Sequence, residues 1–232
     1  MKIRKFILFL IPLICGCAMM QMKVPQELFE KTSVYEVNGR NDLSWSEKYN
    51  FGPFSVEDFH RSGTETTRLG IDSWNISEST YSFEFVLTGP KGRWQGKCSF
   101  DMNRQHLSFD DVFKGSLSVE LDARTLFVCK LDGSGEQEKW ILKMNQESDS
   151  SALQGMLVGE GRYIKVQGTS EIEGSAIPLS TASGYFFMEQ GKFLGAVDVV
   201  NNGRVFLPHG LDENVLAAAS TALLYYKAKY PH

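Results

Sequence analysis

A stretch near the carboxyl end of this 232-residue chain, Val215–Tyr226, contains no charged residue. Acidic Asp212 and Glu213 precede it, which suits the positive end of a helix dipole. Pro231 follows it, so the pattern predicts one helix over 212–228. A helix on a protein surface carries a charged face, whereas a helix that is apolar almost all round is buried. Twelve helical residues span about 18 Å, which is too short to cross a membrane but suits the interior of a β-barrel.

The chain before this helix reads as one strand after another from residue 33 to 207. In Thr80–Leu87, for example, apolar residues alternate with polar ones. Short sequences typical of hairpin turns separate such runs, because Gly and Asn tolerate positive φ. These turn signals are Asp132-Gly133, Gly159-Glu160-Gly161, Gln190-Gly191 and Asn202-Gly203. They indicate roughly ten to twelve strands, joined mainly as antiparallel hairpins.

We therefore predict a mainly β fold, an antiparallel β-barrel or strongly curled sheet with the C-terminal α-helix buried inside it. The pattern leaves two alternatives open: a helix that covers one open sheet, and a helix that forms part of a dimer contact. One polar gap, 147–151, interrupts the strands and has the length of a loop. Residues 32–232 are therefore expected to form a single β-rich domain that ends in the helix.

The amino-terminal segment has the pattern of a secretory signal peptide. Lys2, Arg4 and Lys5 give it a positive start, and Phe6–Ile14 is apolar apart from Pro12. Nine helical residues reach about 14 Å, well short of a bilayer core of roughly 30 Å. The pattern therefore favours a signal peptide over a membrane-spanning helix.

The sequence Leu13-Ile14-Cys15-Gly16-Cys17 resembles the lipobox of bacterial lipoproteins, in which a small residue precedes the modified cysteine. The resemblance implies a signal peptide over 1–16, diacylglycerol on the thiol of Cys17, and an acyl chain such as palmitate on the new amino terminus. Residues 17–31 would then be the acylated cysteine and a tether. Two or three acyl chains together hold a protein stably in a membrane. The alternative is an ordinary signal peptide with two incidental cysteines.

The location that this implies is outside the cytoplasm. The protein would be exported and lipid-anchored, in the outer membrane facing the periplasm if the source is Gram-negative. The full chain has a net charge of −4, and cleavage after residue 16 would remove three basic residues and no acidic one. Because nucleic acid needs a basic face, it is not an expected partner. The expected partners are the membrane, through Cys17, and an envelope protein or a small ligand.

Two cysteines remain in the body of the chain, Cys98 and Cys129, and both lie in strand-like runs. An even pair in an oxidising compartment predicts a disulfide. Neither a CxxC motif nor a Cys/His cluster with zinc spacing is present in the sequence, so no metal site is expected. The alternative is two free, buried thiols.

The carboxyl-terminal part of the chain resembles the tubby and LURP-one fold, in which a final helix runs through a closed barrel. The resemblance rests on Gly184–Phe187, Gly191–Asp198, Gly203–Leu207 and Leu211–Tyr226. It implies a closed barrel here too. Members of that group contact phosphoinositides or membranes through basic residues, but this chain is acidic, so no binding residue is carried over. A second resemblance is to lipocalins, through Gly92-Arg93-Trp94, although this tripeptide lies far from the first strand.

The candidate ligand-binding residues are an arginine and three tryptophans. Aromatic side chains stack on carbohydrate or peptide while charged groups orient it. The candidates are Arg40, Trp45, Trp74 and Trp94. The alternative is that the tryptophans are half-buried strand residues.

The sequence contains no catalytic signature that we could assign, and no cofactor is expected. We expect a non-catalytic binding or envelope-assembly module. The alternatives are an extracytoplasmic hydrolase whose site forms only in three dimensions and a lipocalin-like carrier of a small ligand. A deep pocket with convergent ionisable groups would favour the enzyme, and a filled barrel would favour the module.

Overall fold

The computed structural model describes residues 20–40, 48–66, 79–101, 125–135, 138–145, 152–210 and 212–229. The signal peptide, Cys17, Trp45 and Trp74 lie outside these ranges. The described elements, in chain order, are α1 (Gln26–Lys31), β1 (Thr32–Asn38), β2 (Tyr49–Phe51), β3 (Phe54–Thr66), β4 (Ser79–Gly89), β5 (Gly92–Asp101), β6 (Thr125–Asp132), β7 (Lys139–Asn145), β8 (Gln154–Gly159), β9 (Arg162–Thr169), β10 (Gly184–Glu189), β11 (Lys192–Asp198), β12 (Arg204–Pro208) and α2 (Glu213–Lys229).

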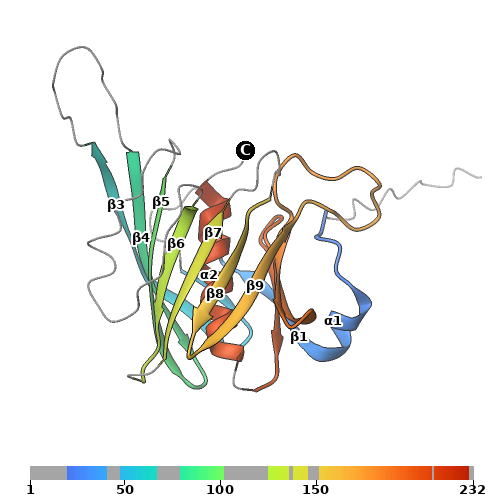
Figure 1. Ribbon diagram of the computed structural model, residues 1–232, viewed down its shortest axis with the longest axis horizontal. Helices are drawn as coiled ribbons and strands as arrows, with labels where there is room; N and C mark the ends of the chain where they lie inside the picture. Colours follow the sequence, from blue (N-terminus) through green and yellow to red (C-terminus); the bar gives the residue numbers. More distant parts are fainter. Residues whose placement is uncertain are drawn as a thin grey trace, which may run out of the picture.

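The described strands form one closed antiparallel barrel (Figure 1). From β2 to β12 each strand pairs with the next along the chain. The ring closes through β1, which pairs with β12 on one side and with β2 on the other. The structure thus confirms the predicted antiparallel barrel.

Helix α2 runs inside this barrel (Figure 1). It contacts β11 and β12 on one side and β4, β5 and β6 on the opposite side. Every residue from Asn214 to Tyr225 is at most 5% exposed. The buried helix predicted over 212–228 is confirmed, and a helix that covers one open sheet is excluded because both of its faces are dry.

Small and aromatic side chains fit the helix to the barrel wall. Gly203 in the β11–β12 turn lies so close that a Cβ atom there would stand 2.7 Å from a methyl group of Leu224. At the other side, the ring of Tyr225 stacks on Phe59 with centroids 4.1 Å apart and also packs against Phe83. The helix therefore replaces the side-chain layers that fill a narrower barrel.

Two of the predicted hairpins have the geometry that their glycines indicated. Glu160 and Gly161 in the β8–β9 turn, and Gln190 and Gly191 in the β10–β11 turn, all have positive φ. Positive φ at both central residues defines the type I′ turn, whose twist matches that of the flanking strands.

The two cysteines of the barrel wall form the predicted disulfide. Cys98 and Cys129 lie directly opposite each other on β5 and β6. Their sulfurs are 2.02 Å apart, and their Cα atoms are 4.0 Å apart. Both side chains belong to the core inside the barrel.

Removal of this disulfide should destabilise the protein measurably. The bond closes a loop with a sequence separation of 31, and for that length the chain-entropy estimate is about 3–4 kcal/mol. The double variant Cys98→Ala/Cys129→Ala should lose about this much free energy of unfolding in a urea titration. A urea midpoint equal to that of the oxidised parent protein would contradict the expectation.

The segment before β1 packs on the outside of the barrel. Met22 and Leu28 are fully buried against outward-facing side chains of β10, β11 and β12. The backbone of Met22 also forms an isolated β-bridge with Ile172. The sequence suggested a tether over 17–31, but its described part, residues 20–31, is docked on the barrel, because its apolar side chains cover an apolar stripe. We call residues 20–31 the strap.

Among the described residues, no helix has both the length and the hydropathy needed to cross a membrane.

Candidate functional site

The two ends of the barrel differ in the length of their connections. At one end, which we call the turn end, tight hairpins join β2 to β3, β4 to β5, β8 to β9 and β10 to β11. At the other, the loop end, the connections are longer, such as residues 170–183 between β9 and β10. Loops carried on a rigid scaffold are where binding residues concentrate. The described residues include three polar clusters: one at the turn end, one at the loop end and one under the strap.

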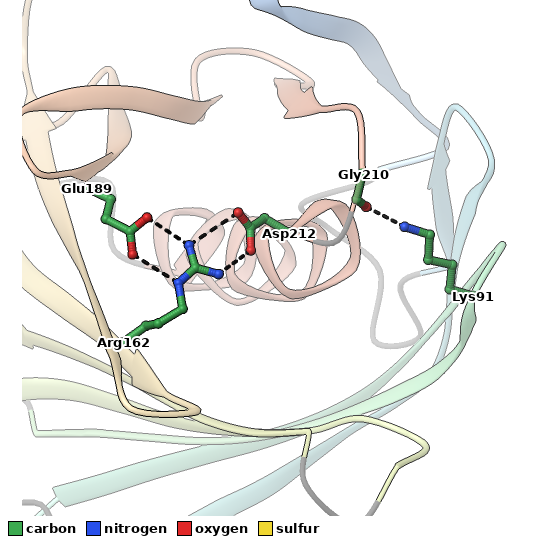
Figure 2. A network of polar contacts seen from close by, with 5 residues as sticks. All are labelled: Lys91, Arg162, Glu189, Gly210 and Asp212. Atoms are coloured by element: carbon green, nitrogen blue, oxygen red, sulfur yellow. Dashed lines mark hydrogen bonds and ion pairs between the residues drawn. The ribbon is translucent and has the colours of Figure 1, made fainter.

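The first cluster is at the turn end and centres on Arg162, the first residue of β9 (Figure 2). Its guanidinium donates to both carboxylate oxygens of Glu189, over 3.0 and 2.9 Å. It also donates to both carboxylate oxygens of Asp212, over 2.5 and 3.3 Å. The hydrogen bonds to the two carboxylates raise the pKa of Arg162 above its usual value. Arg162 therefore stays charged and joins two hairpins to the start of α2.

The position of Asp212 explains what this cluster does. Its carbonyl oxygen accepts a hydrogen bond from the backbone N–H of Leu216, 3.0 Å away, so it begins the first turn of the helix. The side chain of Lys91 donates to the carbonyl oxygen of Gly210 in the same connection (Figure 2). The cluster fixes the point where the chain enters the barrel, and its guanidinium forms ion pairs with both carboxylates.

The second cluster is at the loop end and centres on Arg40. Its guanidinium donates to the carbonyl oxygens of Asn201 and Asn202, over 3.4 and 3.3 Å. A third bond, of 3.1 Å, reaches the carbonyl oxygen of Leu224 in α2. The predicted ligand-binding arginine thus binds the backbone of its own chain, and it holds the helix to the β11–β12 turn.

The third cluster lies under the strap and centres on Asp198, which is 2% exposed. One carboxylate oxygen accepts from the guanidinium of Arg204, over 2.9 and 3.1 Å. The same oxygen accepts from the backbone N–H of Met22, 3.1 Å away, and the second oxygen accepts from Val200 over 2.9 Å. Burial raises the pKa of Asp198, an effect that the hydrogen bonds and Arg204 only partly offset. Asp198 therefore links the strap to the barrel wall.

The structure places Trp94 in the barrel core, at 4% exposure. Its side chain points inward from β5 and packs in the core, so Trp94 is more deeply buried than the half-buried strand position that the sequence left open as the alternative. The structure does not bring Arg40 and Trp94 together as one site, and Trp45 and Trp74 lie outside the described residues.

Sequence reasoning missed the clusters around Arg162 and Asp198, although a signal for each was present. Asp198 and Arg204 flank the turn signal at Asn202-Gly203, and hairpin pairing places them opposite each other. Arg162 and Glu189 each adjoin a glycine turn, and antiparallel pairing brings both turns to the same end. Among the described residues, no group of three or more His, Cys, Asp or Glu side chains is arranged to hold a metal ion.

The fold and these clusters define a class of architecture, a closed β-barrel built around its own terminal helix. No family model, no curated protein and no solved structure matches this chain.

Proposed function

We propose that this protein is an exported lipoprotein, anchored in a membrane through acylated Cys17, that acts as a non-catalytic binding or assembly module of the cell envelope. The filled barrel carries the proposal of a module, and the lipobox-like sequence that ends at Cys17 carries that of the anchor. The helix α2 occupies the interior with side chains from both walls packed against it. The arginines of the three clusters are engaged with carboxylates or backbone carbonyls of the same chain. Such an architecture offers its surface and its loops to partners.

The disulfide supports the proposed location. Disulfides persist in oxidising compartments outside the cytoplasm and are rare inside it. The bond between Cys98 and Cys129 is therefore in keeping with export.

We also propose that the resemblance to the tubby and LURP-one fold reflects a shared architecture. The closed barrel and the interior helix, which the resemblance implied, support this proposal. A lipocalin-like carrier is the second candidate, favoured by the barrel itself. A ligand of such a carrier would need a place outside the helix-filled interior, so we rank this candidate lower.

The anchor is tested by the variant Cys17→Ser. Without the thiol there is no atom to receive diacylglycerol, so the variant should incorporate no radiolabelled palmitate and should not partition into detergent. Cys15→Ser is the matched control, because it changes a neighbouring cysteine and should leave acylation intact. Labelled fatty acid in the Cys17→Ser protein would refute the proposed anchor.

A further inference from the structure

We propose that the loop end of the barrel rests on the membrane, with the connection between β9 and β10 (residues 170–183) as its contact with lipid. The inference rests on the proposed acylation of Cys17 and adds to it an orientation and a contact residue, Ile177. The kind of partner is a lipid bilayer surface.

The strap starts at the loop end of the barrel. The carbonyl oxygen of Met20 accepts a hydrogen bond of 2.6 Å from the side chain of Asn201, in the β11–β12 turn at the loop end. The next residues pair with the β9–β10 connection, since Glu173 donates its backbone N–H to Gln21 over 2.8 Å. Lys23 and Glu171 form an ion pair of 2.9 Å beside them. The amino end of the strap is therefore fixed at the loop end.

The reach from the start of the strap to the anchor is short. Three peptide units separate Cys17 from Met20, so their Cα atoms lie within about 11 Å of each other. The 17 residues of α2 run from the turn end to the loop end and measure about 25 Å, more than twice that reach. An anchor at Cys17 thus holds the loop end near the bilayer and leaves the turn end away from it.

The loop end presents an exposed apolar side chain on the side where the anchor lies. Ile177 is 78% exposed, the highest value among the large apolar side chains of the described residues. The connection that carries it is ordered by its own hydrogen bonds, including Leu179 N–H to the Ser170 carbonyl oxygen at 2.9 Å and Ser183 hydroxyl to the Glu171 carbonyl oxygen at 2.7 Å. Residues 174–183 carry no charge. Such a loop holds an apolar side chain out in water, where a lipid surface would cover it.

The charges around the loop decide the character of the contact. Glu171 and Glu173 flank it, and among the described residues Lys23 is the basic residue that interacts with them. Attraction to anionic lipid therefore does not drive the contact. The contact should be apolar and should persist at high salt.

The test uses the acylated, full-length mature protein in phosphatidylcholine vesicles that contain doxyl-labelled lipid. Single cysteines for an environment-sensitive fluorophore are introduced by Ile177→Cys and Lys192→Cys, two exposed positions at opposite ends of the same wall. A third, Glu30→Cys on the strap, reports a barrel that lies on its side. The native cysteines do not interfere, because Cys98 and Cys129 are bonded to each other and Cys17 carries lipid.

We expect lipid quenching at position 177 to exceed that at positions 192 and 30 several-fold, at low and at high salt. Equal quenching at 177 and 192, or stronger quenching at 30, would overturn the orientation. Mass spectrometry of Cys17 in the same samples separates the two proposals: an unmodified cysteine refutes the anchor, whereas an acylated cysteine with equal quenching refutes only the orientation.

A linker variant supplies the matched control. Ten Gly/Ser residues inserted between Met19 and Met20 extend the reach by about 17 Å and leave the strap in place. The quenching at position 177 should then fall toward that at 192, while acylation is unchanged. If quenching at 177 stays at its original level in the linker variant, the short reach does not set the orientation, and the proposed orientation by the anchor is wrong.

Discussion

The variant Ala219→Asp is expected not to fold. Ala219 is 0% exposed in the middle of α2, where barrel wall surrounds the helix on both sides. A carboxylate there has no described partner within the apolar core, and burying it costs several kcal/mol even if the group takes up a proton. That cost approaches the total stability of a typical domain, about 5–15 kcal/mol. Circular dichroism and thermal melting of the purified protein check the expectation.

Two further variants calibrate this result. Ala176→Asp makes the same chemical change at an exposed position of the β9–β10 connection and should leave the melting temperature almost unchanged. Leu223→Ala, also at a fully buried position of α2, should reduce the free energy of unfolding by about 2–5 kcal/mol through the cavity it leaves. An Ala219→Asp protein that melts cooperatively near the melting temperature of the parent would show that water reaches one face of α2.

The second large effect is expected for Asp198→Ala. The substitution leaves the guanidinium of Arg204, whose side chain is 11% exposed, without its carboxylate. It also leaves the N–H groups of Met22 and Val200 without their acceptor. Breaking a buried pair in this way costs about 3–5 kcal/mol. We expect a loss of that size in urea titrations, together with faster proteolysis within the strap.

An exposed ion pair between the same strap and the β9–β10 connection is the control for this prediction. Lys23 and Glu171 are each 61% exposed, and exposed pairs add little stability because water and salt screen them. Lys23→Ala should therefore leave both the urea midpoint and the proteolysis pattern close to those of the parent. The double variant Asp198→Ala/Arg204→Ala should recover part of the stability lost in Asp198→Ala. If Asp198→Ala and Lys23→Ala behave alike, the buried cluster does not hold the strap.

The same carboxyl group should make stability depend on pH. Its pKa in the folded protein is raised, chiefly by burial, above the value of about 3.9 in an unfolded chain. The folded state therefore binds this proton more firmly, and the stability gained from it is present at acid pH and is lost as pH rises through the folded pKa. Relative to Asp198→Asn, the free energy of unfolding of the parent should therefore fall as pH rises from the unfolded pKa through the folded pKa of Asp198. Above the folded pKa the difference between the two proteins should stay constant.

The helix was predictable because one continuous stretch of sequence, free of charged residues, indicates it. The uncharged run Val215–Tyr226 has no face that could meet water, and only an enclosing sheet can bury it from every side. The hairpins were predictable for a similar reason. Gly161 and Gly191 have positive φ, which glycine adopts readily because it has no Cβ atom. The closed barrel was expected from the buried helix and from the resemblance, but the strands that close it were not predicted, because the pairing of Thr32 with Pro208 joins residues that no local pattern relates.

The polar clusters were harder to predict than the fold. Arg40 stood out as a charged residue near a tryptophan, but the groups that bind it are backbone carbonyls, which every residue carries. The docked strap was missed because Met22 and Leu28 are ordinary apolar residues of a short segment. Their partners, Phe186 and Phe206, lie far along the chain. Such contacts depend on the assembled barrel and leave no periodic trace in the sequence.

The order of the elements along the chain has a consequence for biogenesis. Among the described elements, the strap and β1 are synthesised first, yet β1 closes the ring only against β12, and α2 follows after that. A nascent chain that lacks α2 therefore has the strands of the barrel but not the helix that fills it. Domains generally fold as units during synthesis, and exposed apolar surface invites aggregation. We therefore expect a copy truncated before α2 to lack its core and to be unable to fold stably.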